Sequence, residues 1–178
     1  MTPNPRSRKR PPDQPPPQPP DPAEDVLSER KRGNKTAQRA AEILVALNEG
    51  YIVPTRAQKK KLIIAFAKKD RIVYGRAYDI VRITPGIQLD LNDQDSIERH
   101  LSALTLYEIK STERKNVDST FKGHFFALTT AELLVAQNLK HQFRFIFVNV
   151  RTGHHQDLTL REVLNRARGF YPQWSISF

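Results

Sequence analysis

The amino-acid sequence predicts an α/β (α+β) domain, in which a mixed central sheet is flanked by helices, behind a disordered proline-rich tail. Two observations lead to this expectation. Residues 1–33 hold ten of the thirteen prolines of the 178-residue chain and almost no large apolar side chains, so they cannot bury enough surface to fold. Residues 34–178 alternate between helical and strand hydrophobic periods, and their number suits one domain.

The composition excludes several classes of protein and favours one class of partner. The chain has no cysteine, which excludes disulfide scaffolds, cysteine-ligated zinc and thiol nucleophiles. It has no apolar run of about 18 residues and no signal-peptide pattern, so we expect a soluble intracellular protein, cytoplasmic or, in a eukaryote, nuclear. The formal net charge is +10, of which residues 34–178 carry +8. This charge makes a nucleic acid the first partner to consider.

Helices are predicted where apolar residues recur at spacings of three and four. The first is followed by Gly50, a residue suited to a C-terminal cap, and two later ones begin with capping boxes at Thr129 and Thr159. The lysine-rich face of the second helix would either lie along a phosphate backbone or simply be solvated. The predicted helices span about 35–48, 55–69, 96–103, 130–139 and 159–168.

Strands are predicted where apolar residues alternate or form short runs. The phenylalanines at 143, 145 and 147 alternate, so we expect them on one buried strand face rather than on a base-stacking platform. Tyr51–Val53 is expected to be a connector, 113–121 a polar loop, and His154–His155 a turn. The predicted strands are 71–74 and 77–83, which Gly75 would separate or bend, 104–112, 143–150 and 174–178.

The strand predicted over 104–112 has an unusual face. At strand period, Leu104 and Leu106 share a face with Glu108 and Lys110, so this face changes from apolar to charged halfway along. Glu108 and Lys110 also form one of three acid–x–lysine patterns in the chain, but the other two lie in polar surroundings at 29–31 and 113–115. Context therefore singles out the pattern within the apolar strand.

A second carboxylate, Asp79, lies within another apolar strand. If the two strands are neighbours, Asp79 and Glu108, with the carbonyl of Ile109, could hold a hard divalent cation such as Mg²⁺. Lys110 could then orient a water and stabilise charge, which outlines a site for phosphodiester hydrolysis. The alternative is that Glu108 and Lys110 form an ion pair at a strand end while Asp79 caps a turn.

Three parts of the sequence carry a resemblance to the PD-(D/E)XK nuclease superfamily, and within it to the domain at the C-terminus of the plant protein NO VEIN. The resemblance covers residues of about 35–150. It implies a restriction-endonuclease-like fold, Mg²⁺ dependence, with Mn²⁺ as a substitute, and cleavage of DNA. Tyr78 stands where the superfamily has its proline. The parts are Gly75-x-x-x-Asp79-Ile80, Tyr107–Thr112, and Phe125–Thr129 with Glu132.

The resemblance also indicates further residues. Many members place an acid on the first helix, for which Glu42 is the candidate and Gln38 the alternative. Apart from the resemblance, the basic residues just past the motif, Arg114, Lys115 and Lys122, are expected to contact a nucleic-acid backbone. Because one active site cuts one strand, double-strand cleavage would require a homodimer or a partner subunit.

The sequence thus leads to the hypothesis of a Mg²⁺-dependent nuclease, most simply acting on DNA in restriction, repair or defence. Asp79, Glu108 and Lys110 are its expected catalytic residues, and Asp79, Glu108 and the Ile109 carbonyl its metal ligands. One alternative is a noncatalytic module of the same fold that binds nucleic acid or protein. Another is a nuclease that acts on RNA.

Overall fold

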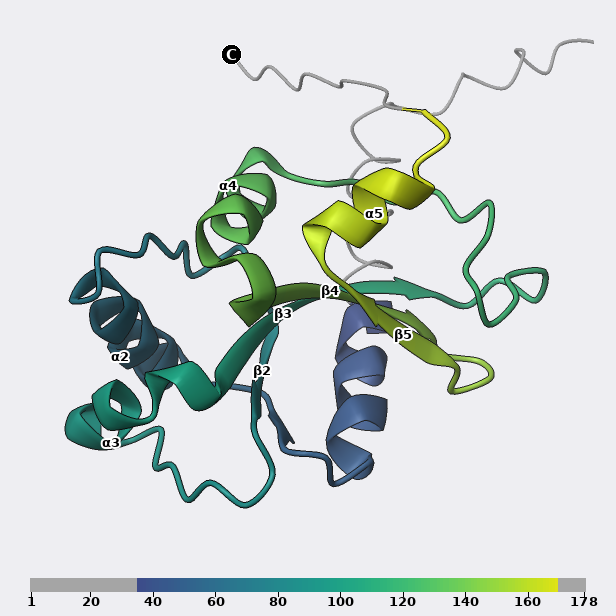
Figure 1. Ribbon diagram of the computed structural model, residues 1–178. Helices are drawn as coiled ribbons and strands as arrows, with labels where there is room; N and C mark the ends of the chain where they lie inside the picture. Colours follow the sequence, from purple (N-terminus) through teal and green to yellow (C-terminus); the bar gives the residue numbers. More distant parts are fainter. Residues whose placement is uncertain (1–34, 170–178) are drawn as a thin grey trace, which may run out of the picture.

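A five-stranded mixed sheet forms the centre of the computed structural model, which describes residues 35–169 (Figure 1). The strands lie side by side in sequence order, and β3 and β4 are parallel while the other neighbours are antiparallel. The expected mixed sheet is confirmed. The tail of 1–33 and the strand expected over 174–178 fall outside the described residues. The strands are β1 (Tyr51–Ile52), β2 (Ile80–Ile83), β3 (Leu104–Thr112), β4 (Phe143–Asn149) and β5 (His155–Leu158).

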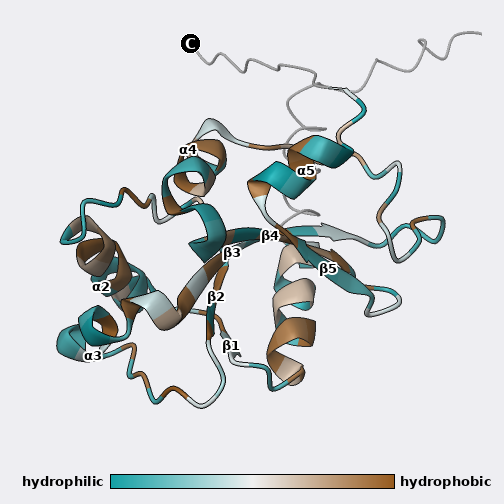
Figure 2. Cartoon of the chain, viewed as in Figure 1, coloured by the Kyte–Doolittle hydropathy of each residue, from teal (hydrophilic) through white to brown (hydrophobic). Residues whose placement is uncertain are grey.

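Helices cover both faces of the sheet. The helical residues 35–46, purple and unlabelled in Figure 1, cover one face, and the other helices pack on the opposite one. Figure 2 shows brown and teal segments on the same helices, as expected of elements with one buried side. The remaining helices are α2 (Arg56–Ala67), α3 (Gln94–Arg99), the short 3₁₀ turn η1 (Leu101–Ala103), α4 (Thr130–Leu139), η2 (Lys140–Gln142) and α5 (Leu160–Arg166).

Capping boxes fix where three of these helices begin. In α4 the hydroxyl of Thr129 accepts from the backbone N–H of Glu132, whose carboxylate accepts from the backbone N–H of Thr129. The same box opens α5 with Thr159 and Glu162, and both were predicted from the sequence. A third capping box, which begins at Thr55, opens α2.

The two faces of β3 enter two separate clusters of buried side chains. Leu104 and Leu106 pack with α2, α3 and α4, and Tyr107 and Ile109 pack with helix 35–46. The three alternating phenylalanines of β4 are buried on the α2 and α4 side, which confirms their place in the core. Their exposed fractions are 0% for Phe143, 0% for Phe145 and 3% for Phe147.

Three strand predictions were wrong. Residues 51–52 form β1 instead of a connector, because Gly50 lies against β2: its carbonyl accepts from the N–H of Ile83 at 2.9 Å. Residues 71–74 form no strand, and β2 starts only at Ile80. His155 begins the edge strand β5 instead of belonging wholly to a turn.

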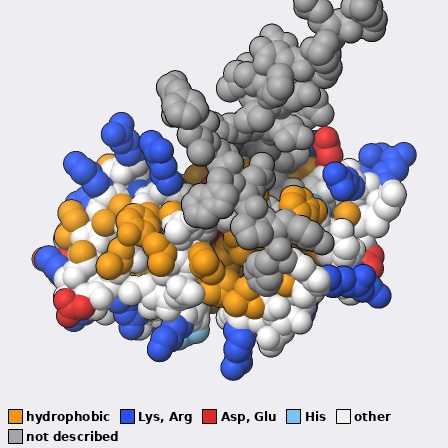
Figure 3. All heavy atoms as spheres, turned by 90° about the horizontal axis from the view of Figure 1, so that it is seen from above, with side chains coloured by type: hydrophobic (Ala, Val, Ile, Leu, Met, Phe, Trp, Pro, Cys, Tyr) orange, Lys and Arg blue, Asp and Glu red, His pale blue; other side chains and the backbone are white. Residues whose placement is uncertain are grey.

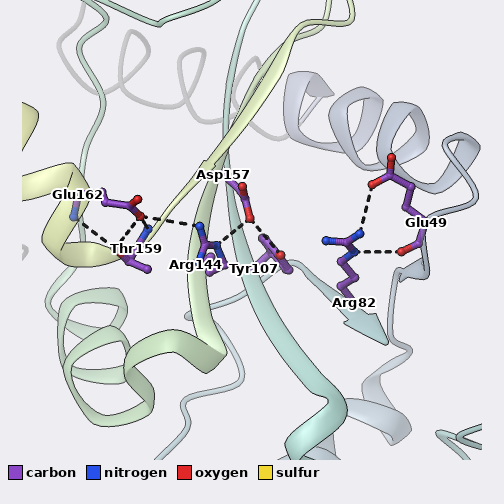
Figure 4. Close-up of polar contacts among 7 residues, drawn as sticks. All are labelled: Glu49, Arg82, Tyr107, Arg144, Asp157, Thr159 and Glu162. Carbon is purple, nitrogen blue, oxygen red and sulfur yellow. Dashed lines mark hydrogen bonds and ion pairs between the residues drawn. The ribbon is translucent and has the colours of Figure 1, made fainter. Parts of the chain in front are cut away.

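A row of polar contacts joins several strands on the side of helix 35–46 (Figure 4). Asp157 of β5 accepts from the hydroxyl of Tyr107 at 3.3 Å and pairs with Arg144 at 2.7 Å. Arg144 also lies 3.7 Å from Glu162, at the start of α5. These contacts tie β3, β4, β5 and α5 together, so they stiffen the frame that holds the opposite face of β3.

No helix among residues 35–169 combines the length and the apolar character needed to cross a membrane.

Candidate active site

Strand register brings Asp79 level with Glu108. Ile80 pairs with Tyr107 in the antiparallel ladder of β2 and β3. Asp79 comes directly before Ile80 and Glu108 directly after Tyr107, so these two residues lie opposite each other. Asp79 donates its backbone N–H to the carbonyl of Tyr107 at 2.9 Å. Its Oδ2 accepts the backbone N–H of Ile109 at 3.0 Å, in the position that a strand carbonyl would otherwise fill. The sequence-based pairing of Asp79 with Glu108 therefore agrees with the structure.

Glu108 and Lys110 lie on the same face of β3, two residues apart. The Nζ of Lys110 is 2.9 Å from Oε1 of Glu108 and 2.8 Å from Oε2 of Glu132, the third residue of α4. The side chains are nearly enclosed, because Glu108 is 8% exposed and Glu132 is 4% exposed. Asp79 just before β2, the strand β3 and the helix α4 thus bring three carboxyl groups and one ammonium together.

Glu132 is a site residue that the site prediction from the sequence missed. Its capping box gave it a complete local explanation, and that explanation is correct. The additional contact with Lys110 depends on the parallel pairing of β3 with β4, which sets where α4 returns to the sheet. The available signal was a glutamate in the first turn of the helix that follows the acid–x–lysine strand.

Burial controls the proton equilibrium of Glu108. Removal from water, followed by the charges of Asp79 and Glu132, raises the pKa of its carboxyl to about 9 although the nearby Lys110 opposes the shift. A cation beside Glu108 would favour the ionised form and lower this pKa again.

Burial and the neighbouring carboxyl groups also set the charge state of Lys110, but here they act against each other. Burial alone would lower its pKa, but the adjacent Glu108 and Glu132 outweigh burial and raise it above the ordinary lysine value. Lys110 is therefore a fixed positive charge at neutral pH. It suits the role of a charge stabiliser or hydrogen-bond donor better than that of a general base.

A second lysine approaches the cluster from α2. The Nζ of Lys59 donates to the carbonyl of Tyr78 at 2.7 Å and to that of Gly75 at 3.3 Å, and it lies 4.6 Å from the centre of the Tyr78 ring. Burial lowers the pKa of Lys59, while Asp79 and Glu108 act against this shift through their charges. Lys59 therefore fixes the turn that leads into Asp79.

The donors at this site suit a hard cation such as Mg²⁺. Oδ1 of Asp79 makes no hydrogen bond within residues 35–169, and Glu108 keeps a second oxygen beyond the one facing Lys110. The carbonyl of Ile109 points to the same side as its N–H, where β2 has ended. Within the described residues, no set of three or more acidic, histidine or cysteine side chains is arranged to hold a metal ion. Two carboxylates and a carbonyl are nevertheless a donor set that Mg²⁺ accepts, with water as its other ligands.

The structure does not bring Glu42 to this cluster. Helix 35–46 packs on the Tyr107 and Ile109 side of β3, opposite Glu108 and Lys110. Glu42 is exposed there and accepts a 3.3 Å hydrogen bond from Gln38, the other candidate for the helix acid. A strand separates both side chains from the carboxyl cluster, so Glu132 is the helix acid that reaches Lys110.

The expected nucleic-acid contacts lie on the segment between β3 and α4. Arg114, Lys115 and Lys122 are all exposed. The buried side chain of Asn149 anchors the beginning of this segment, since its Nδ2 donates to the carbonyl of Arg114 at 3.2 Å and to that of Val117 at 3.3 Å. The backbone at the start of this segment is thus held in place, while the basic side chains are exposed to solvent.

Histidines contribute little to the site. His124 packs its ring against Phe121 and Phe126, with centroid separations of 6.3 Å in both cases. Burial, and then the charge of Arg114, lowers the pKa of His124. His154 and His155 are exposed at the outer edge of the sheet.

The fold and this cluster define an α/β protein with a five-stranded mixed sheet and a buried group of carboxyls and lysine at its centre. Comparisons with protein-family models, with curated protein sequences and with solved structures give no match to the chain.

Proposed function

We propose that the protein is a Mg²⁺-dependent nuclease of the PD-(D/E)XK kind that hydrolyses phosphodiester bonds, in the first place those of DNA. The observation that carries the proposal is the hydrogen bond of Asp79 to the N–H of Ile109. This contact sets the carboxylate of Asp79, the residue before β2, beside the acid–x–lysine pattern of β3, which is the arrangement that the resemblance implies.

Each residue has a separate role in this proposal. Asp79, Glu108 and the Ile109 carbonyl would hold Mg²⁺, which when bound supplies positive charge against the charge that develops on the phosphate. Lys110 would donate a hydrogen bond to the attacking water or to a phosphate oxygen. Glu132 would keep Lys110 charged and aimed along the face of β3, which its 2.8 Å contact supports.

The surroundings of the cluster agree with a polyanionic substrate. The chain carries a formal charge of +10, and the segment between β3 and α4 exposes Arg114, Lys115 and Lys122. The net charge of the protein attracts DNA or RNA without distinguishing between them. Cuts in both strands would call for a homodimer or a partner subunit.

The first experiment is a panel of single- and double-stranded DNA and RNA, each incubated with Mg²⁺ or Mn²⁺. We expect metal-dependent cleavage of DNA by the unmodified chain. Asp79→Ala and Lys110→Ala should each reduce the rate by about 10²–10³-fold or more. Glu113→Ala is the matched control, because Glu113 belongs to the neighbouring acid–x–lysine pattern and is exposed. Equal metal-dependent activity in all four proteins would overturn the assignment.

One observation favours a noncatalytic module as the second candidate. Lys110 contacts two carboxyl groups at once, at 2.9 and 2.8 Å, so the cluster holds together through its own charges. A binding module would keep this arrangement as a structural element. Salt-sensitive DNA binding, together with no effect of Mg²⁺ on the folded protein, would support this candidate.

A further inference from the structure

A pocket of about 670 Å³ lies beside the carboxyl and lysine cluster, between the segment that precedes α4, the strands β4 and β5, and α5. Two residues connect it with the cluster. Phe147, which lines the pocket, is the strand partner of Lys110, and Leu128, which also lines it, comes directly before the Thr129 cap of α4. The pocket therefore lies on the same face of the sheet as Lys110 and Glu132, although neither of these two side chains lines it.

Aromatic rings form much of the wall. Phe147 packs against Phe126 at 4.8 Å and against Phe121 at 5.7 Å between ring centroids, so these three rings hold one another in place. Phe125 belongs to the same lining, yet it is 71% exposed, the highest exposed fraction among the large hydrophobic side chains described. An aromatic ring that stays exposed beside a fixed aromatic wall is a stacking surface without a partner among residues 35–169.

The charges around the pocket have one sign. Lys122, Arg166 and Arg168 line it, all three are exposed, and neither aspartate nor glutamate is among its lining residues in the described part of the chain. Figure 3, which views the molecule from above, shows more Lys and Arg than Asp and Glu side chains around the visible hydrophobic ones. Aromatic walls with a positive rim match a ligand that combines a flat ring with a phosphate.

We propose that this pocket binds an unpaired nucleobase, with the adjoining phosphates held by Lys122, Arg166 and Arg168. A volume of about 670 Å³ lies within the range of about 300–1,000 Å³ usual for small-ligand pockets. A base inside a duplex is stacked and paired, so it cannot enter without leaving the helix. The preferred nucleic acid is therefore single-stranded, or carries a frayed or flapped end.

This inference rests on the proposed function, since it names the substrate class of the same protein. In that setting the pocket would hold a nucleotide on one side of the phosphate to be cut. The enzyme would then act at junctions between single- and double-stranded segments or within single strands, and uninterrupted duplex would be a poor substrate.

The test measures binding in EDTA, so that cleavage plays no part. The probes are fluorescein-labelled twelve-nucleotide strands of DNA and RNA, the same DNA with abasic sites, and the corresponding blunt duplex. We expect the single strands to bind at least about 10-fold more tightly than the duplex and the abasic strand, because each stacked base contributes about 1–3 kcal/mol. Duplex binding as tight as single-strand binding would overturn the proposal.

Phe125→Ala is the deciding variant, because an exposed ring can be removed without disturbing the core. It should weaken single-strand binding by about 5-fold to 100-fold and leave duplex binding unchanged. Tyr74→Ala is the matched control, since Tyr74 is 45% exposed and does not line the pocket. An equal loss in both variants, or no loss in Phe125→Ala, would contradict the stacking role.

The readout separates this inference from the nuclease proposal. Asp79→Ala should keep single-strand binding in EDTA even though it loses cleavage. Cleavage by the unmodified chain without any effect of Phe125→Ala on binding would refute the pocket alone. Absence of single-strand binding in EDTA would likewise refute the pocket.

Discussion

Lys110 and Glu132 are 22 residues apart in the chain, yet Nζ of the lysine lies 2.8 Å from Oε2 of the glutamate. The same oxygen of Glu132 accepts the backbone N–H of Thr129 at 3.1 Å. One carboxylate therefore caps helix α4 and also holds the lysine of the candidate site, so the start of the helix and the position of Lys110 are mechanically connected.

Glu132→Gln tests this connection. Glutamine still completes a capping box, so α4 should form as before. Loss of the negative charge should lower the pKa of Lys110, because Glu132 is one of the groups that raise it. NMR titration of the lysine side chain measures this shift, and cleavage should fall as well. Glu162→Gln, at the same capping position of α5, is the matched control and should leave Lys110 unchanged.

Glu108→Gln should make the metal-free protein more stable at neutral and mildly alkaline pH. The folded pKa of Glu108 is raised to about 9 from 4.5, so between these values the native state binds more protons than the unfolded state. The stability that this group contributes is thus fully present below about pH 4.5 and is lost as the pH rises through about 9.

Removal of the titrating carboxyl should flatten this decline. We expect a gain on the order of 1–3 kcal/mol near pH 9 and little change at pH 4, measured by urea unfolding in EDTA. If the protein is a nuclease, the same variant should lose Mg²⁺-dependent cleavage. An unchanged slope of stability against pH in Glu108→Gln would show that this carboxyl ionises normally.

Lys59→Met should loosen the turn that leads into Asp79. The variant keeps the length of the side chain but removes the donor that satisfies the carbonyls of Tyr78 and Gly75. An unsatisfied buried carbonyl costs about 1–3 kcal/mol, and Tyr78 is buried, so a fall of that order in unfolding free energy is expected. Lys60→Met, at the adjacent exposed position, should change stability by less than about 0.5 kcal/mol. Equal losses would remove the special role of Lys59.

Gly50→Ala should destabilise the fold more than Gly86→Ala. Both glycines have a positive φ, of 86° and 85°, so both substitutions cost about 1–2 kcal/mol of backbone strain. A Cβ at Gly50 would also lie 2.3 Å from the carbonyl oxygen of Ile83, whereas nothing lies within 4 Å at Gly86. The additional clash should add about 1–3 kcal/mol, which thermal or urea unfolding can resolve.

The central strand was predictable because its pattern is long. The structure places β3 at Leu104–Thr112, the range that alternation predicts. In contrast, β1 has two residues, too few to show any period, and it exists because Gly50 allows the chain to approach β2. The edge strand β5 begins with polar residues, since one side of it meets water.

The part of the site that could be predicted from the sequence is the part that depends on strand patterns. Asp79 and Glu108 could be paired from the sequence because each is a carboxylate in an apolar strand. The roles of Glu132 and Lys59 could not be predicted. Glu132 already has a sufficient local role as a helix cap, and Lys59 belongs to a run of lysines. Their contacts depend on how α4 and α2 pack on the sheet, which no local pattern encodes.

The parallel pairing of β3 with β4 also has a kinetic consequence. The antiparallel strands β2 and β3 can meet after closing one moderate loop, which already sets Asp79 beside Ile109. Contact between Lys110 and Glu132 spans 22 residues, against 30 for Asp79 and Ile109, but it requires α4, which follows both strands in the chain, to have been synthesised and docked. A chain emerging from the ribosome would therefore hold its two strand carboxylates together before it acquires the helix that restrains its lysine.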